Sequence, residues 1–393
     1  EIAGVSALDK GEGQDFPRDG LVWYEDAMEL AEAPDIDLVV ELIGGSEGIA
    51  KKLIEASIAG GKHVVTANKA LIAHHGADLA TKAEAAGVVL AFEAAVAGGI
   101  PIVKALREGL AANRFSQVFG ILNGTCNYIL TEMRQTGRDF GEVLAEAQAL
   151  GFAEADPSFD VDGVDAAHKL AILTSLAFGV EMDFDAIHME GIRHVSALDI
   201  QFADELGYRI KLLGITRLTD QGIEQRVHPC MVPQGTPISN VEGVFNAVVV
   251  EGDFVETTIY EGKGAGAGPT ASAVVADIAD IARGRDARVF SVPTDKLEPH
   301  KHLPMNAHAG YYYVRLMVLD RPGAFADIAG VLRDNKVSME AILQRGRAPG
   351  EAVPVVLTTH ETDEAAMSAT LDAIAKLNTV VETPRMIRIE AFD

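Results

Sequence analysis

Short apolar runs alternate with longer amphipathic segments along the first hundred residues. The runs are continuously hydrophobic, which is typical of strands buried on both faces, and they cover residues 2–8, 37–43, 63–66 and 88–92. The segments between them show helical spacing and cover residues 27–33, 46–59 and 70–86. Ser46 is placed to cap the second of these helices. Strands that alternate with helices in this way predict a parallel α/β sheet, whose ligands bind at the carboxyl ends of its strands.

The pattern becomes irregular after residue 100. Predicted helices cover residues 101–111, 126–135 and 270–282, with a helical segment near 203–206. Predicted strands cover residues 115–122, 209–217, 225–232, 247–251 and 254–260. This mixture indicates an α+β domain. The last part of the chain, residues 311–393, predicts a separate unit in the order β-α-β-β-α-β, the split βαβ arrangement.

The segment from Gly151 to Gly179 combines an acidic loop with an apolar helix. The acidic side chains of the loop are Glu154, Asp156, Asp160 and Asp162. Pro157 argues against a helix in the loop, whereas the residues from about Gly163 predict a helix that is apolar on nearly every side. Asp165 and Lys169 interrupt that helix and lie on one face, four residues apart. They indicate either an ion pair at the helix edge or a site for a cationic, polar ligand, and the acidic loop favours the site.

A dinucleotide-binding fingerprint, G-x-G-x-x-G, does not follow the first predicted strand. The order of elements predicts that it lies upstream of Glu1, in a first strand and turn that precede the sequence given. The glycine run GKGAGAG at 262–268 comes too late in the chain to be that turn. It is interpreted as a loop that returns to the cofactor region.

Composition and charge narrow the class of protein. The 393 residues carry a formal net charge of −25, which argues against nucleic acid or an anionic membrane surface as a partner. No apolar run approaches the roughly 20 residues of a membrane-spanning helix. The two cysteines, Cys126 and Cys230, are too few for a disulfide framework. We therefore expect a cytoplasmic protein.

Three stretches together resemble homoserine dehydrogenases. The first is VVTANK at 64–69, and the second, within 93–127, contains AGGIPIVKALREGL and GILNGTCNYIL. The third is the acidic loop and its helix, where E-x-D-P is followed by D-x-x-G-x-D-x-x-x-K. The C-terminal unit resembles an ACT domain, an amino-acid-sensing module, and its turn at 320–323 matches the ligand-loop pattern.

The resemblance implies reversible, NAD(P)-dependent conversion of L-homoserine to L-aspartate 4-semialdehyde, a step toward threonine, methionine and isoleucine. Lys169 matches the family's acid/base lysine, and Lys69 matches a second lysine near cofactor and substrate. Glu154 and Asp165 match acids that bind the substrate, and Asp160 aligns with another acid of that loop. Asp165 would also hold Lys169 in place.

The resemblance also implies a structural sodium site, formed by Glu93, Val96, Gly98 and Ile100. A capping role is the alternative for Glu93. Cofactor contacts are implied for Thr66 and Lys69 and for Gly264 or Gly266, and a strand-end turn is the alternative for Thr66. Because residues 6–10 offer both Asp9 and Lys10 near the expected ribose, NADP and NAD both stay open.

The expected architecture is therefore a Rossmann-type dinucleotide-binding domain, an α+β catalytic and oligomerisation domain, and a C-terminal ACT domain. We expect the first at residues 1–95, rejoined by about 265–290, and the second at 96–264. A linker at 291–310 and the ACT domain at 311–393 follow. Expected partners are the small-molecule substrate, threonine at the ACT domain, and further copies in a homodimer or homotetramer. Another Rossmann-fold NAD(P) oxidoreductase and a non-catalytic amino-acid-sensing ACT protein are the alternatives.

Overall fold

A computed structural model describes residues 1–8, 20–285, 288–345 and 348–392 of the chain. The chain divides into two compact units. Unit 1 comprises Glu1–Val118, Ala167–Ile187 and Asn246–His300, and unit 2 comprises Phe119–Ala166, His188–Phe245 and Lys301–Asp393. The division falls within the strand β6 (Phe115–Ile121) and within the helix α8 (Val164–Phe178).

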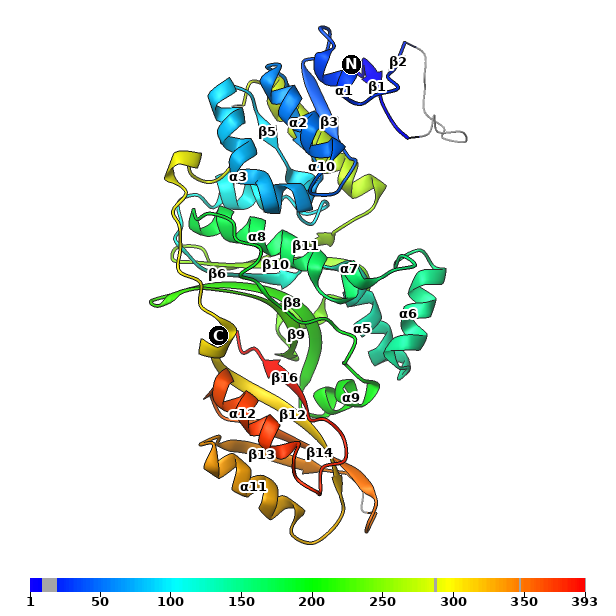
Figure 1. Ribbon diagram of the computed structural model, residues 1–393, viewed down its shortest axis with the longest axis vertical. Coiled ribbons are helices and arrows are strands. Elements are labelled where there is room, and N and C mark those ends of the chain that lie inside the picture. Colours follow the sequence, from blue (N-terminus) through cyan, green and yellow to red (C-terminus); the bar gives the residue numbers. More distant parts are fainter. Residues whose placement is uncertain (9–19, 286–287, 346–347, 393) are drawn as a thin grey trace. The chain divides into compact units, whose positions relative to one another are not determined.

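Unit 1 is built around a parallel sheet in the order β3-β4-β5, as the alternating pattern predicts. Its strands are β3 (Leu38–Glu41), β4 (His63–Thr66) and β5 (Leu90–Ala91). The helices α2 (Ile49–Ala59), α3 (Lys69–Ala86) and α10 (Ala267–Ala282) belong to the same unit (Figure 1). Val274 of α10 packs against Val65 and Ala91, so a segment almost 200 residues further along the chain covers this sheet.

Smaller elements complete unit 1. β1 (Gly4–Val5) and β2 (Val22–Trp23) form a separate parallel pair, and α1 (Met28–Glu32) follows them. The sheet order β11-β10-β6 is formed by β6 with β10 (Phe245–Gly252) and β11 (Glu256–Lys263). A 3-10 turn at Glu93–Ala95 follows β5.

Three local predictions for unit 1 are wrong. The run at 2–8, predicted as a strand buried on both faces, contains only the two-residue β1, and Ile2 and Leu8 are exposed. The N-cap of α2 is Gly48, with a φ of 85°, because the chain turns through successive left-handed glycines after β3 and passes Ser46 before the helix begins. The helix predicted at 101–111 is instead a short α4 (Ile102–Lys104) followed by a π-helical turn at Ala105–Gly109. A wider turn of this kind cannot be recognised from apolar spacing alone.

Unit 2 contains a long antiparallel pair of strands, β8 (Tyr208–Thr219) and β9 (Gly222–Pro233), which pair from Tyr208↔Pro233 to Thr219↔Gly222. The short strand β7 (His188–Met189) runs parallel to β9. The helices of this part of unit 2 are α5 (Gly124–Thr136), α6 (Phe140–Ala149), α7 (Ser158–Val161) and α9 (Ala197–Glu205).

The C-terminal part of unit 2 has the predicted β-α-β-β-α-β order. Its elements are β12 (Ala309–Leu319), α11 (Ala324–Asp334), β13 (Met339–Gln344), β14 (Ala352–Thr359), α12 (Glu364–Ile374) and β16 (Arg385–Ile389), with a two-residue β15 (Thr362–Asp363). The strand order is β16-β12-β14-β13, and α11 and α12 pack on it together (Figure 1). β16 also pairs in parallel with β9, so the sheet continues from this part into the strands before it.

The segment at 291–310, predicted as a linker, contains two 3-10 turns, at Thr294–Lys296 and Met305–Ala307, and the first two residues of β12. Isolated β-bridges connect this segment to distant parts of the chain, because Glu298 pairs with Val180 and His302 pairs with Ile223. Within the described part of the chain, no helix combines the length and the apolar character needed to cross a membrane.

Candidate active site

The acidic loop of unit 2 contains a short helix that the sequence analysis did not predict. Pro157 does not prevent a helix here but stands at the N-cap of α7, where its missing N–H costs nothing. The loop before it is anchored through its backbone, because Gln148 Nε2 donates to the Glu154 carbonyl at 2.9 Å. The side chain of Glu154 is exposed. Asp160 lies on α7 and is half-buried.

Asn123 joins two of the predicted substrate-binding acids. Its Nδ2 donates to Asp160 Oδ1 at 2.7 Å and to Asp165 Oδ2 at 2.9 Å. Its Oδ1 accepts from the Cys126 N–H at 2.8 Å, so the same side chain caps α5. Because one amide donates to both carboxylates, Asp160 and Asp165 are held side by side within unit 2.

Asp165 and Lys169 lie one turn apart on α8, as the spacing predicts, and they are only 4% and 7% exposed. Their helix neighbours Leu170, Ile172 and Leu173 are buried almost completely. Charged groups in such surroundings are costly to desolvate, so both groups need compensating partners. For Asp165 one such partner is the Asn123 amide.

Unit 1 carries polar groups at the carboxyl ends of β3 and β4. Thr66 is completely buried, and its hydroxyl donates to Glu41 Oε2 at 2.6 Å while it accepts from the Asn68 N–H. The other oxygen of Glu41 accepts from the N–H groups of Ile43 and Gly44. The Thr66 hydroxyl thus binds Glu41, and Glu41 in turn holds the backbone of the turn that follows β3.

Lys69 is the first residue of α3, after Asn68, whose side chain caps the helix by accepting from the Leu71 N–H. A positive charge at a helix N-terminus opposes the helix dipole. Lys69 is half-buried at this position. The helix dipole therefore does not stabilise the charge of Lys69.

The two glycine-rich segments of unit 1 lie backbone against backbone. The N–H groups of Gly98 and Gly99 donate to the carbonyls of Gly264 and Lys263, both at 2.9 Å. A Cβ on Gly264 would lie 2.2 Å from the side-chain amide of Asn246. Among the residues that the structure describes, Asn246 Nδ2 is buried and has no hydrogen-bond partner. The backbone at 263–264 therefore lies close to the backbone at 98–99, and the unsatisfied Asn246 Nδ2 donor lies beside Gly264.

Glu93 is 3% exposed and lies in an acidic cluster with Asp277 of α10. Its two carboxylate oxygens accept from the N–H groups of Val103 at 3.0 Å and Lys104 at 2.9 Å, which is the capping geometry. Lys104 Nζ contacts Asp277 Oδ1 at 3.0 Å. Burial, reinforced by the charge of Asp277, raises the pKa of Glu93 to about 7. Ala97, in the segment that follows, has a φ of 48°, a strained value for a residue with a Cβ.

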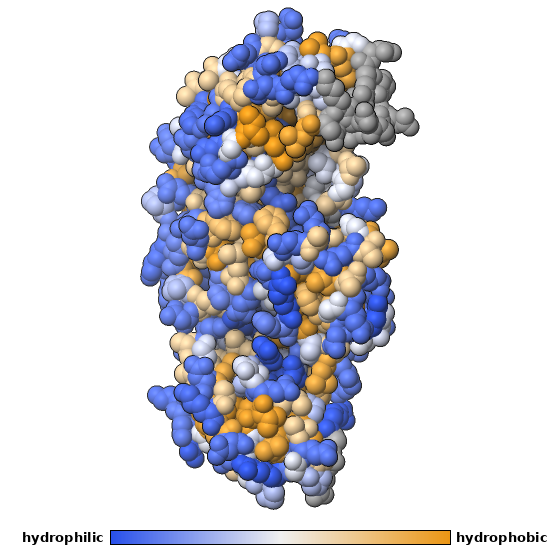
Figure 2. Space-filling model, turned by 45° about the vertical axis from the view of Figure 1, so that its right-hand side comes forward, coloured by the Kyte–Doolittle hydropathy of each residue, from blue (hydrophilic) through white to orange (hydrophobic). Residues whose placement is uncertain are grey.

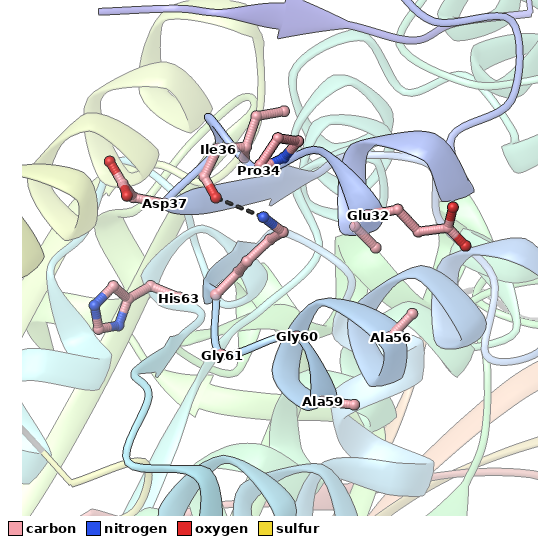
Figure 3. Close-up of a pocket in the computed structure, with 11 residues that line it drawn as sticks. Glu32, Pro34, Ile36, Asp37, Ala56, Ala59, Gly60, Gly61 and His63 are labelled. Atoms are coloured by element: carbon pink, nitrogen blue, oxygen red, sulfur yellow. Dashed lines mark hydrogen bonds between the residues drawn. The ribbon is translucent and has the colours of Figure 1, made fainter.

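A pocket of about 830 Å³ opens elsewhere in unit 1 (Figure 3). Its lining includes Asp37 and His63, at the amino ends of β3 and β4, and Gly60 and Gly61. Lys62 Nζ donates there to the carbonyls of Ala33 and Ile36, both at 2.6 Å. Ligands of parallel sheets bind at the carboxyl ends of the strands. This pocket lies at the amino ends and is therefore not the expected cofactor site.

Three family profiles match successive parts of the chain. The profile of the homoserine dehydrogenase NAD-binding domain matches residues 8–93, and the profile of homoserine dehydrogenase itself matches residues 101–279. An ACT domain profile matches residues 312–379.

Proteins of known identity are similar over most of the chain. Homoserine dehydrogenase of Neisseria gonorrhoeae is 50% identical over 376 residues, which cover 94% of this chain and 86% of the relative. The crystal structure of a homoserine dehydrogenase from Thiobacillus denitrificans has a TM-score of 0.89 at 49% identity, covering 94% of this chain and 86% of that one. A hyperthermophilic archaeal homoserine dehydrogenase in complex with NADPH has a TM-score of 0.59 at 29% identity, covering 67% and 76%.

The parallel sheet with its NAD-binding profile, followed by a catalytic domain and an ACT domain, defines an NAD(P)-dependent oxidoreductase with a regulatory module. More specifically, the chain belongs to the homoserine dehydrogenase family. It therefore interconverts L-homoserine and L-aspartate 4-semialdehyde. Neither alternative from the sequence, a different oxidoreductase or a sensor without catalysis, accounts for this agreement over 94% of the chain.

Sequence reasoning missed three polar residues around these groups. Asn123 lies within the motif GILNGTCNYIL, from which no role for its side chain follows, although its position between β6 and α5 is a signal for a ligand-edge residue. Nothing in the local sequence distinguishes Glu41 or Asn246. Asp9 and Lys10, which bear on the choice of NAD or NADP, lie outside the described residues.

Proposed function

We propose that Lys169 is the catalytic acid/base, with Asp165 and Lys69 as its helpers, and that Asp165, Asp160 and Glu154 bind the substrate. The ammonium group of homoserine needs carboxylates, and the observation that carries this proposal is the Asn123 amide holding Asp160 and Asp165 together. Lys169 follows Asp165 by one turn of α8, so the proton donor lies next to the group that fixes the substrate.

The proton step follows from these placements. Reduction of the aldehyde builds negative charge on its oxygen, and the Lys169 ammonium stabilises this charge and donates the proton. In the reverse direction, the neutral lysine takes the hydroxyl proton of homoserine. The bound nicotinamide cofactor supplies or accepts the hydride. Lys69 adds a second positive charge in the same reaction.

The test is turnover of aspartate semialdehyde with NADPH and with NADH by Lys169→Ala. We expect kcat to fall by about 10²- to 10⁴-fold, the usual contribution of a general acid. Lys82→Ala, which removes an exposed lysine of α3, is the matched control and is expected to keep full activity. Unchanged turnover of Lys169→Ala would show that the assignment is wrong.

We further propose that the cofactor contacts Thr66 and Lys69 after β4 and Gly264 or Gly266 before α10. The buried donor of Asn246 and the absence of room for a Cβ at Gly264 support a ligand at this loop. For Thr66 the contact would be through its backbone, because its hydroxyl is bonded to Glu41. The NADPH complex of the archaeal relative supports NADP, and the test is the KM for NADPH and NADH in Asn246→Ala, which we expect to rise.

A sodium ion held by Glu93 and the carbonyls of Val96, Gly98 and Ile100 is also proposed. Its support is the buried pair of acids, Glu93 and Asp277, and the strained turn at Ala97. We expect NaCl to raise the melting temperature above that in choline chloride of equal ionic strength, and Glu93→Gln to abolish the difference. Glu108→Gln, at an exposed position, should keep it. Equal melting temperatures in the two salts would argue against the site.

Threonine inhibition through the ACT domain is proposed for the turn at 320–323. Gly323 is the N-cap of α11 and has a φ of 93°, a backbone conformation that would be strained for any residue other than glycine. We expect threonine to inhibit the enzyme and Gly323→Ala to weaken that inhibition. Gly330→Ala, on the same helix with open space around it, should respond like the unmodified chain. Threonine insensitivity of the unmodified chain would contradict the proposal.

We also propose a cytoplasmic homodimer or homotetramer. Both cysteines are buried thiols, which suits a reducing compartment. Apolar side chains gather on the surface of the ACT part, at the bottom of Figure 2. Among the exposed apolar side chains of this part are Met339 and Ile342 of the edge strand β13. Light scattering coupled to size exclusion tests the assembly, and a monomeric mass would contradict it.

A further inference from the structure

The last strand of the ACT domain is bonded to the catalytic part of unit 2. β16 pairs in parallel with β9, with Arg388 opposite Cys230 and Ile389 opposite Met231. The ACT domain therefore shares a sheet with strands that neighbour the substrate-binding acids. This raises the question of which ACT residues act on those acids.

Arg388 connects the two parts through an ion-pair network. Its side chain is 3% exposed and donates to Glu364 of α12 at 3.0 and 2.5 Å. It also donates to both carboxylate oxygens of Glu190, at 3.1 and 2.8 Å. Glu364 accepts a further bond from Tyr312 Oη at 2.9 Å. One guanidinium thus bridges the ACT core to a residue just after β7, with the bidentate geometry that fixes orientation.

The residues that follow Glu190 lie directly on α7. A Cβ on Gly191 would lie 2.2 Å from the Val161 carbonyl, so the two backbones touch and only glycine fits. The Ile192 N–H donates to the same carbonyl at 2.9 Å. Arg193 then donates to both carboxylate oxygens of Asp162, at 2.5 and 3.1 Å. We call residues 190–193 the clamp segment.

The clamp segment reaches the start of α8 as well. Gly163, between α7 and α8, has a φ of 89° and lies against Val227 and the Glu190 carbonyl. Asp160 precedes and Asp165 follows this point, and the Asn123 amide fixes both. A displacement of the clamp segment would therefore move the backbone that carries both acids.

We propose that Arg388 and Glu190 are positioning residues for homoserine, which set the placement of Asp160 and Asp165 through the clamp segment. The inference rests on the proposed substrate-binding role of these two acids. It assigns a function to the ACT strand β16 in the reaction itself, in the absence of any effector. The consequence is that the ACT domain tunes affinity for the amino-acid substrate and leaves the cofactor unaffected.

Glu190→Ala in the full-length enzyme is the principal test. Arg388 keeps Glu364 in this variant, and the Glu190 side chain is 41% exposed, so no buried charge is left without a partner. We expect the KM for homoserine to rise about 5-fold or more, as misplaced binding groups do. The KM for NADPH and kcat should stay within twofold. Hydrogen exchange in peptides covering 157–165 should become faster, because the clamp no longer holds α7.

Three further variants make the result specific. Met189→Ala changes an exposed neighbour on β7 and should match the unmodified enzyme in every measurement. Arg388→Lys keeps the charge but lacks the fork, and it should give an intermediate KM. Arg385→Met, on the same strand opposite Arg315, should leave the KM for homoserine unchanged.

Each contrary result points to a distinct failure. An unchanged KM for homoserine and unchanged exchange in Glu190→Ala would overturn the positioning role. A parallel loss of kcat, both KM values and melting temperature would overturn it too, because it would indicate a purely structural part. Asp165→Asn tests the underlying assignment separately, since an unchanged KM for homoserine in that variant refutes the substrate-binding role itself.

Discussion

One amide group can hold two carboxylates together because it has two hydrogens to donate, and Asn123 uses its amide in this way. Both acceptors are carboxylates, those of Asp160 and Asp165, and their negative charges would repel each other without the shared donor. The same side chain caps α5 through its oxygen. Asn123 thus has two roles, to bridge the two acids and to cap α5, and a substitution can remove one and keep the other.

Substituting Asn123 with serine separates them. Serine is also a good N-cap residue but has no amide, so the cap is retained and the bridge between the acids is lost. We expect kcat/KM for homoserine to fall at least about 10-fold, the effect of losing a hydrogen bond to a charged group. The melting temperature should change by only a few degrees. An Asn123→Ser enzyme with full kcat/KM would contradict the bridging role.

Lys211 is a second residue whose surroundings predict a measurable effect, here on stability. Burial lowers the pKa of Lys211 to about 8, although Glu242 opposes the shift. Its ammonium donates to the Val241 carbonyl at 2.5 Å and to Asn127 Oδ1 at 3.3 Å. Between pH 8 and the ordinary lysine value of 10.5, the unfolded chain binds more protons here than the folded chain. The free energy of unfolding should therefore rise with pH across that window.

The measurement is urea unfolding of the unmodified chain and of Lys211→Met at pH 7.5 and pH 10. The stability of the unmodified chain relative to the variant should increase by on the order of 2 kcal/mol as the pH rises. Taking the difference cancels the titration of other groups. Parallel pH profiles for the two proteins would show that Lys211 titrates normally.

Among whole elements, those with a strong local pattern could be predicted from the sequence. β4 has the predicted bounds, His63–Thr66, since a continuous apolar run between glycines and a helix start leaves no other choice. α8 begins one residue after the predicted position because Gly163 supplies the left-handed turn before it. In both, the local signal and the tertiary packing favour the same structure.

Elements and contacts that depend on distant parts of the chain could not be predicted. Glu93 meets Asp277 across 184 residues, and Asn123 meets Asp160 across 37. No periodicity encodes such pairs, so the sequence suggested the chemistry of the acids but not what holds them. α6, which packs against α5, is also not among the helices predicted from the sequence.

The glycine loop before α10 gives a prediction at the scale of an element. In Gly264→Ala the new methyl group would collide with Asn246, whereas Gly268→Ala points into open space on α10. We expect Gly264→Ala to lower stability by about 1–3 kcal/mol through overpacking and to raise the KM for NADPH. Gly268→Ala should be neutral or slightly stabilising, as alanine is in a helix. Equal behaviour of the two variants would contradict the close approach.

For the whole molecule, the pairing of β16 with β9 means that the ACT domain is not a removable module. Arg226 of β9 is 2% exposed and binds both carboxylate oxygens of Glu390, which follows β16. The Glu390 N–H also donates to the Met231 carbonyl at 2.9 Å. Regulation by the ACT domain is for this reason better tested with substitutions than with truncated chains.

A chain that ends at residue 310 should therefore be strongly destabilised, even though the candidate catalytic residues are all retained. It leaves the Arg226 guanidinium without Glu390 and exposes the edge of β9, and loss of one partner of a buried ion pair costs about 3–5 kcal/mol. We expect a lower melting temperature or insoluble expression. In the shortened chain the buried Arg226 charge keeps, among the described residues, only Glu224 as its ion-pair partner, at 3.4 Å. Arg226→Met removes this charge and should recover part of the loss, because a neutral side chain of similar length fills the same space. If the shortened chain melts at the temperature of the full chain, β16 contributes nothing to the catalytic unit, and the route from Arg388 to the substrate-binding acids loses its structural basis.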